Sequence, residues 1–352
     1  MNISGIKSAV ICGIAQTGLQ RRFHLGGATT LVFHRFFGEG ETRVDGRERL
    51  KRICHWLKKN SFPLSAAEYL ECSKQQSFLK NSLLVTIDDA RKRILDAIDI
   101  FFDFEIPLTL FAVVGWTDGA QADSPVTLPR LITVLEHYRG APFEILLSNG
   151  ERLSVGARDG ERGTGIDRVI QMANQKHDFV EDLWNQLGNA ARSEGMEPEI
   201  CGWKDLADLA SKGVTIGSHS VSHCRLARQS SQRIEFEVRE SRRIFESRFG
   251  KCDMFAYPYG IWDVHNDMTT AALKAAGYQC AFLVAAGFGK EADPYRLPRI
   301  AIPDQQIDLR LFAALAQGGQ IPLIRLKNLL TGRNRPPNPR RGPASRPEIR
   351  RR

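Results

Sequence analysis

Residues 83–90 read LLVTIDDA, and the fold that we predict for this chain is built around them. The first five residues are apolar or β-branched, which is typical of a buried strand. Asp88 and Asp89 follow where that strand ends. Two adjacent carboxylates repel each other, and burying both is costly unless a cation compensates for their charge. The stretch therefore predicts a buried strand that ends at a metal ion or a basic partner.

A second stretch, residues 216–223 with the sequence IGSHSVSH, supplies the ligands for a metal ion. His219 and His223 are four residues apart, so on a helical turn their side chains would face the same way. One carboxylate of the aspartate pair and two imidazoles make a three-ligand site for a divalent ion, with one position left open for water.

Strand and helix patterns alternate along most of the chain. Apolar residues at helical spacing follow the aspartates over residues 94–102, and another apolar run follows that helix. Strand, helix, strand is the βαβ unit of a parallel sheet, and α/β folds place their sites at the carboxyl ends of the strands. Repetition of such units favours a barrel over a sandwich. We predict core strands at residues 29–33, 83–87, 106–114, 214–216, 254–257 and 280–284.

Three motifs, taken in order, resemble those of the polysaccharide deacetylase family, the NodB homology domain. The first family motif, T-F-D-D-G, stands here as TIDDA at residues 86–90. The second, H-[ST]-x-x-H, is met in full at residues 219–223, and the third, R-x-P-[YFW]-G, in part at residues 256–260. The resemblance covers roughly residues 29–302. It implies an α/β fold, a distorted (β/α) barrel of about seven parallel strands with an insertion between the first and second motifs.

The same resemblance implies a metal-dependent hydrolase that removes N-acetyl groups from a carbohydrate. Asp89, His219 and His223 would hold a divalent metal ion, for which we expect zinc. Asp88 would be the base that takes a proton from water, and the backbone N–H of Tyr259 would stabilise the oxyanion. The structural alternative for the Asp-His-His set is a group of buried ion pairs and capped histidines.

The chain departs from the third family motif because Ala256 stands where the family has an arginine that orients the base. Arg296 or Arg299 is placed to supply that charge from a neighbouring strand, with ordinary salt bridging as the alternative, and we take Arg296 as the site residue. Ala90 replaces the glycine of the first motif, which should matter little if the backbone there is helical.

A second departure concerns the proton donor, because no histidine follows His265 and the family's late L-x-H motif is missing. In one branch of the family the first strand ends in an aromatic residue and a histidine, and Phe33 and His34 resemble that pair. His34 is therefore our candidate for the general acid, with His265, another group or a water as the alternatives. The structural alternative for His34 is a loop histidine that forms a hydrogen bond to neighbouring loops. These two gaps keep a carbohydrate-binding pseudoenzyme open, and an amidohydrolase acting on a small amide or a lipid-linked sugar is the further alternative.

Outside the motifs, we divide the chain into four parts. Residues 1–28 form a lead-in with a peripheral helix, and residues 29–305 form the barrel. Within the barrel, residues 118–198 are an insertion that either roofs the site or is peripheral, and an Asn-Gly turn predicts a hairpin there. Residues 306–332 form C-terminal helices that pack on the barrel or lie at a membrane face. Residues 333–352 form a disordered basic tail.

Most of the net charge of +9 comes from that tail, whose eight arginines and one acid give +7 and leave +2 for the remaining chain. A nucleic-acid partner is therefore not expected; the tail is either a solubilising segment or a contact for an anionic membrane surface. Seven cysteines without a C-x-x-C pair indicate free thiols in a reducing compartment. With a poor signal peptide and no long apolar stretch, we expect a cytoplasmic enzyme, peripheral membrane contact or export being the alternatives.

Overall fold

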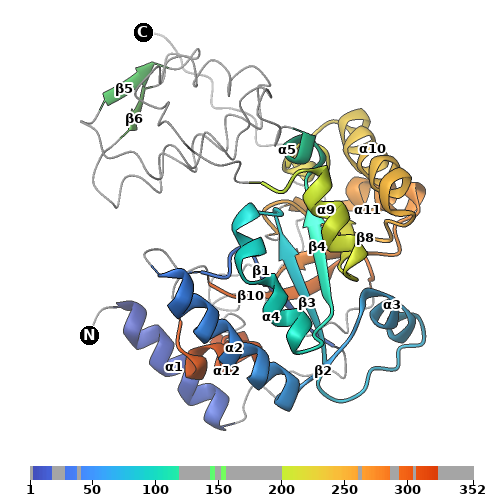
Figure 1. Ribbon diagram of the computed structural model, residues 1–352. Helices are drawn as coiled ribbons and strands as arrows, with labels where there is room; N and C mark the ends of the chain where they lie inside the picture. The colour runs from blue at the N-terminus through green and yellow to red at the C-terminus, as the bar shows by residue number, and fades with distance from the viewer. Residues whose placement is uncertain are drawn as a thin grey trace.

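The computed structural model in Figure 1 describes residues 3–17, 28–37, 41–118, 143–146, 152–155, 200–260, 264–285, 293–303 and 307–323. Within these residues, seven parallel strands form a closed barrel in which the order around the ring follows the chain and the last strand pairs with the first. This confirms the predicted barrel of about seven strands. The strands are β1 (Thr29–Phe33), β3 (Ser82–Asp88), β4 (Leu108–Ala112), β7 (Thr215–Ser218), β8 (Met254–Ala256), β9 (Cys280–Val284) and β10 (Leu297–Ala301).

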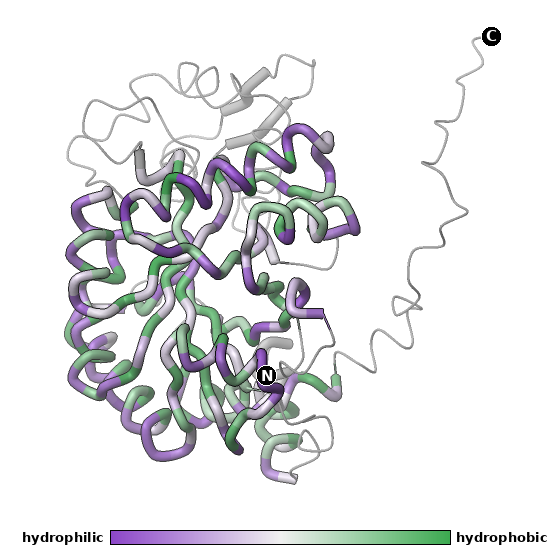
Figure 2. The backbone as a smooth tube through the Cα atoms, turned by 90° about the vertical axis from the view of Figure 1, so that its right-hand side faces the viewer, coloured by the Kyte–Doolittle hydropathy of each residue, from purple (hydrophilic) through white to green (hydrophobic). Residues whose placement is uncertain are grey.

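Side chains alternate between the inside and the outside of this barrel, as the pleat of a strand requires. On β3, Leu84 belongs to an apolar cluster with Phe111 and Phe282 from other strands, which fills the barrel interior. The intervening residues Leu83 and Val85 belong to the larger cluster between the strands and the helices. Every residue of β3 is buried, as its apolar run predicts. Figure 2 shows the same division, with hydrophobic strands inside and mostly hydrophilic outer helices.

Helices surround the barrel (Figure 1). The helix predicted over residues 94–102 is divided, because Ala97 leaves the helical region with φ −150° and ψ 3°, and a 3₁₀ turn precedes a short α-helix. The helical segments are α1 (Ile3–Thr17), α2 (Arg43–Asn60), α3 (Ala66–Lys74), η2 (Lys92–Asp96), α4 (Ile98–Asp103), α5 (Val114–Asp118), α9 (Trp203–Ser211), η4 (Leu226–Arg228), α10 (Ser231–Phe249), α11 (Asp267–Ala276) and α12 (Leu309–Ala316).

Two short pieces extend this architecture. β2 (Phe62–Pro63) pairs with the start of β3, ahead of α3, whose N-cap Ser65 forms a capping box with Glu68. β5 (Phe143–Leu146) and β6 (Arg152–Val155) pair antiparallel in a separate sheet, as the predicted hairpin requires. The Asn-Gly turn between them, and most of the predicted insertion, lie outside the described residues.

The two ends of the described chain meet on the barrel. α1 packs against α12, and Phe312 of α12 contacts Phe33 of β1 and Trp56 of α2. α12 therefore packs on the barrel, which is one of the two arrangements that we predicted for it. Among the described residues, no helix is both long enough and apolar enough to span a membrane. All seven cysteines are free thiols, as predicted.

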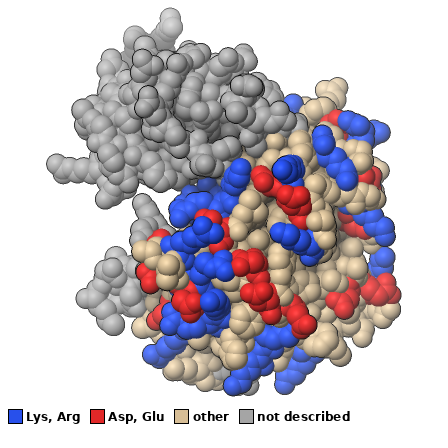
Figure 3. All heavy atoms as spheres, viewed as in Figure 1, with Lys and Arg blue, Asp and Glu red and all other residues tan. Residues whose placement is uncertain are grey.

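Charged side chains of both signs are interspersed over the face shown in Figure 3. Many of them form local ion pairs, such as Arg47 with Asp99 at 2.6 Å and Lys51 with Glu48 at 2.7 Å. This mixed surface agrees with the small net charge that remains once the tail is set aside.

Candidate metal centre and active site

The motif residues meet at one mouth of the barrel. Asp88 is the last residue of β3 and Asp89 follows it, while His219 follows the end of β7 and His34 follows the end of β1. Because the strands are parallel, their carboxyl ends lie at the same end of the barrel. The structure therefore brings together the first two motifs, which lie at the ends of β3 and β7, two strands that are separated in the barrel by β4 alone.

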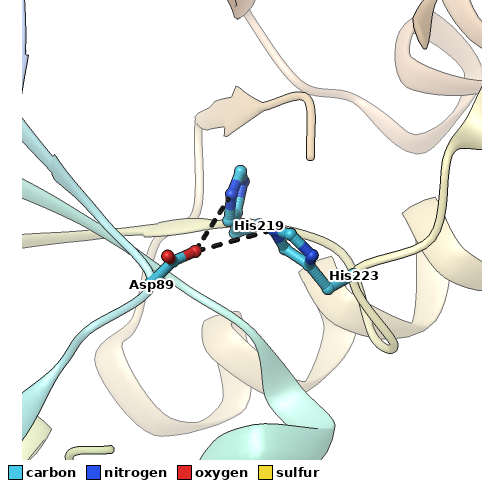
Figure 4. Close-up of side chains that lie close together, drawn as sticks. All are labelled: Asp89, His219 and His223. Atoms are coloured by element: carbon cyan, nitrogen blue, oxygen red, sulfur yellow. Dashed lines mark ion pairs between the residues drawn. The ribbon is translucent and has the colours of Figure 1, made fainter. Parts of the chain in front are cut away.

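Asp89, His219 and His223 point toward one another in Figure 4, and all three are buried. Asp89 Oδ1 lies 3.6 Å from His219 Nε2 and 3.5 Å from His223 Nε2. These separations exceed those of ordinary hydrogen bonds. Ligands about 2.0–2.1 Å from a tetrahedral zinc ion are about 3.3–3.4 Å apart, so the spacing fits a shared cation. Within the described residues, this is the set of His, Cys, Asp and Glu side chains that could hold a metal ion.

The orientation of each imidazole is set by its neighbours. His219 Nδ1 lies 2.8 Å from the carbonyl oxygen of Ala256, so Nδ1–H donates there and Nε2 keeps its lone pair for the site. The His223 ring lies between two aromatic rings, 4.4 Å from Trp116 and 4.7 Å from Tyr259 between centroids. Burial, followed by the neighbouring His219, lowers the pKa of His223 to about 3, so the ring is neutral and able to bind a metal near pH 7.

Asp88 is held by a different cation. Arg299 Nη1 and Nη2 each donate a hydrogen bond of 2.7 Å to one Asp88 oxygen, and Nη1 also lies 3.1 Å from Thr86 Oγ1. Burial alone would raise the pKa of Asp88, but the charges of Arg299 and His219 outweigh it and lower the pKa. Asp88 is therefore ionised, as a base must be, and its charge is compensated within the barrel.

The structure corrects our choice of Arg296 as the arginine beside Asp88. Arg296 lies 3.2 Å from Asp267 and from Asp293, with 35% of its side chain exposed. It precedes β10, whereas Arg299 lies within β10 and points into the barrel, where it is fully buried. Side chains along residues 297–301 alternate between the inside and the outside of the barrel, and this alternation is the sequence signal that distinguishes Arg299 from Arg296.

The loop that carries both histidines is not a helical turn, so that part of our prediction is wrong. Ser220 has φ 70° and His223 has φ 58°, both left-handed, and residues 219–223 form an irregular loop. The His-x-x-x-His spacing brings the rings together here because Ser220 Oγ accepts the His223 N–H at 2.9 Å and folds the loop back. Spacing alone could not distinguish this loop from a helix.

Left-handed backbone also occurs at the other site residues. Asp89 has φ 71°, Ala90 has φ 52° and Tyr259 has φ 66°. Our expectation for Ala90 assumed helical backbone and is wrong on that point, because a glycine would adopt this conformation with less strain. Non-glycine residues in this region gather at functional sites, where the surrounding packing holds them.

The turn after β8 presents Tyr259 to the metal ligands. Its ring lies against His223 on one side and carries the Arg225 guanidinium 4.2 Å from its centroid. The next residue must be glycine, since at Gly260, φ 60°, an added Cβ would lie 2.3 Å from Val284 Cγ2. The third motif thus fixes a tight turn, closed by the Gly260 N–H on the Tyr257 carbonyl, that places the Tyr259 ring against His223.

Of the two histidines considered as proton donors, the structure places His34 with the site. Burial favours the neutral form of Asp89, but the neighbouring His223 and then His34 favour the carboxylate more strongly, so the pKa of Asp89 lies below the usual range. His265 instead lies near Tyr257, 6.0 Å between centroids, and burial and the Arg296 charge lower its pKa. His265 therefore belongs with the outer ion pairs around Arg296.

Trp116 is a site residue that the sequence analysis did not identify. It lies on α5 shortly after the end of β4, and its ring packs on the metal-ligand candidate His223. Its place just beyond the carboxyl end of a core strand is the signal that could have singled it out.

Comparisons with known proteins agree with this geometry. Residues 165–281 match the family model described as polysaccharide deacetylase. No curated protein matches the sequence. The chain is similar in structure to "Streptococcus pyogenes deacetylase PplD in complex with acetate", with 13% identity and a TM-score of 0.53 over 82% of this chain and 98% of that one. It is also similar in structure to IcaB from Ammonifex degensii, with 14% identity and a TM-score of 0.50 over 84% of this chain and 98% of that one.

These structural similarities show a shared fold, and the resemblance predicted from the motifs is confirmed. Both histidines and the third motif lie inside the family match, whereas Asp88 and Asp89 precede it. The first motif, at the end of β3, comes close to the second, at the end of β7, because both strands pair with β4 in the barrel.

Proposed function

We propose that the chain is a member of the polysaccharide deacetylase family, whose model its residues 165–281 match, and that it removes N-acetyl groups from a carbohydrate by hydrolysing a carbon–nitrogen bond with the help of a divalent metal ion. The observation that supports the proposal most directly is that the two adjacent aspartates have different partners. Asp88 is engaged by Arg299, while Asp89 faces two imidazoles at the spacing of metal ligands.

Asp89, His219 and His223 would hold the ion, for which zinc is our choice given one carboxylate and two imidazoles. When bound there, the ion would supply Lewis acidity toward a water and toward the amide carbonyl. The neutral state of His223 and the fixed tautomer of His219 leave both Nε2 atoms available to it.

The chain's own residues would perform the proton transfers. A carboxylate oxygen has two lone pairs, so each Asp88 oxygen can accept an Arg299 N–H and still take a proton from the attacking water. Arg299 would fix the orientation of that base. The Tyr259 N–H would donate to the oxyanion, and His34 would return a proton to the departing amine.

Acetate release tests this proposal. The purified chain would be incubated with chitin oligosaccharides, peptidoglycan fragments and acetylated bacterial glycans, with zinc or cobalt present. We expect release from at least one of them, abolished by a chelator and restored by metal. Protein that is shown to hold metal but releases acetate from none of these substrates would contradict the proposal.

The pseudoenzyme alternative rested on two missing family residues. Arg299 supplies the missing cation from β10, so one of those two reasons no longer holds. The alternative still makes a distinct prediction, glycan binding that Asp88→Asn leaves unchanged together with no turnover. Rates on a monomeric N-acetyl sugar, an oligomer and a lipid-linked glycan would separate the remaining substrate classes.

A further inference from the structure

Glu237 is a fully buried carboxylate on α10 that contacts the histidine loop without being one of the metal-ligand candidates. Its Oε2 accepts hydrogen bonds from the backbone N–H of Val221 at 2.8 Å and of Ser222 at 2.9 Å. Its Oε1 accepts the Ser222 hydroxyl at 2.6 Å and pairs with Arg233 at 2.7 Å. Both oxygens of this carboxylate are therefore committed to the loop and to one compensating cation.

The loop depends on Glu237 for its backbone hydrogen bonds. The His219 N–H donates to the Ala112 carbonyl at 2.8 Å, and the Ser220 and His223 N–H groups donate to nearby serine hydroxyls. The remaining two N–H groups between the histidines, those of Val221 and Ser222, donate to Glu237. Because this loop is neither helix nor strand, no regular ladder is present to accept them, and a buried N–H without an acceptor is costly.

The opposite side of the same loop is held by α5. Val114 and Gly115 donate their N–H groups to the carbonyls of Ser220 and Val221, at 3.2 and 2.8 Å. The loop is thus clamped between the start of α5 and the side chain of Glu237. Burying a carboxylate is unfavourable unless it is paired and fully hydrogen-bonded, and Glu237 meets both conditions at this loop.

From these contacts we infer that Glu237 is a positioning residue for the metal centre. It holds residues 219–223 in the irregular loop conformation, left-handed at Ser220 and His223, that points both imidazoles at Asp89 before any metal binds. The inference rests on the proposed function, since it takes Asp89, His219 and His223 as the ligands. Partners that orient ligands in this way alter metal affinity by about 10- to 100-fold when removed.

Metal affinity and hydrogen exchange test the inference in the full chain. We expect Glu237→Ala to raise the Kd for zinc and for cobalt by about 10- to 100-fold in competition with a chromophoric chelator. Glu237→Gln keeps the size and one acceptor oxygen, so we expect a smaller increase. Glu235→Ala and Glu235→Gln are the matched controls, because Glu235 is on the same helix, exposed and paired with Arg239 at 2.6 Å. We expect both controls to bind metal like the unaltered chain.

The second measurement needs neither metal nor substrate. In metal-free protein, we expect amide exchange at Val221 and Ser222 to accelerate at least tenfold in the Glu237 variants and to stay unchanged in the Glu235 variants. If Glu237→Ala does not fold, Glu237→Gln carries both measurements.

The outcomes keep the two proposals apart. Metal affinity and loop exchange that are unchanged in folded Glu237 variants would overturn the inference while leaving the proposed function intact. An unaltered chain that binds no metal would instead contradict the proposed function. In that case, unchanged amide hydrogen exchange at Val221 and Ser222 in the Glu237 variants would overturn the role of Glu237 as well. Accelerated exchange at these two amides would support that role.

Discussion

At the scale of single residues, Arg299 and Arg296 allow a matched comparison of a buried and an exposed ion pair. Arg299→Met leaves Asp88 as an uncompensated buried charge, so we expect a loss of about 3–5 kcal/mol in the free energy of unfolding. Arg296→Met removes a partly exposed pair and should cost less than about 1 kcal/mol. Urea unfolding of the two variants measures both values. Similar losses would show that Arg299 does not compensate Asp88 as the structure indicates.

The two aspartates should separate in a metal-content experiment. Asp88→Asn keeps all three ligand candidates, so we expect metal to be retained while kcat falls about 10²–10⁴-fold through loss of the base. His219→Ala and His223→Ala each remove one of three ligands and should lose metal sharply. Elemental analysis of dialysed protein, with acetate release measured in parallel, provides the comparison. Equal metal loss in all three variants would make Asp88 a ligand and reverse the assignment of the pair.

At the scale of elements, the sequence predicted strands better than loops, for a physical reason. The buried run at residues 83–87 and the strand at residues 280–284 each carry their pattern within five residues, and β3 and β9 lie where predicted. The loop at residues 219–223 has no such internal pattern. Its shape is imposed by Glu237, and by α5 from another part of the chain, so tertiary contacts that the sequence does not display decide it.

The same limit applies to the arginine of the site. The two candidate arginines, Arg296 and Arg299, are three positions apart near one strand, and the choice between them depends on where β10 begins. A shift of one residue in a strand moves a side chain from the inside of the barrel to the outside. The third motif therefore indicates that an arginine is missing, but the motif does not determine which arginine replaces it.

The turn after β8 makes a prediction at this scale through two glycines with similar backbone. Gly260→Ala meets left-handed strain and places a Cβ 2.3 Å from Val284, so β8 or β9 must shift. Gly250→Ala, at the end of α10 with φ 79°, meets nothing within 4 Å and should cost only about 1–2 kcal/mol of strain. We expect Gly260→Ala to lose more stability than Gly250→Ala in thermal unfolding, and to lose deacetylase activity as well because Tyr259 moves. Equal effects on stability and activity would contradict the close approach at Gly260.

At the scale of the whole molecule, buried thiols make the fold sensitive to alkali. Burial raises the pKa of Cys54, Cys201, Cys224 and Cys252 to about 12, from a reference value of 9.0. Above pH 9 the unfolded chain loses these protons while the native chain keeps them, so stability falls as pH rises through that window. Each thiol contributes at most about 1.4 kcal/mol per pH unit.

Urea unfolding in reducing buffer between pH 8 and pH 11 measures this slope. We expect a nearly flat region up to about pH 9 and then a steep fall. Cys54→Ala should have a shallower slope, because one thiol no longer titrates, even though it starts from a lower stability. A slope that does not change in this variant would mean that groups other than the buried thiols govern alkaline unfolding.

The last prediction concerns where the molecule works. Residues 333–352 carry a net charge of +7, and we propose that they bring a cytoplasmic enzyme to an anionic membrane surface, each basic residue adding on the order of 1 kcal/mol. Phe312 and Leu315 of α12 are buried, so they are not available to insert into lipid. Binding should therefore be electrostatic, strong at low salt and weak at about 0.5 M salt, because dissolved ions then screen the attraction over a short distance.

Co-sedimentation should show the full chain on anionic vesicles but not on neutral ones, and a chain lacking residues 333–352 on neither. If the full chain does not bind anionic vesicles at low salt, the membrane proposal is contradicted and the deacetylase proposal is unaffected.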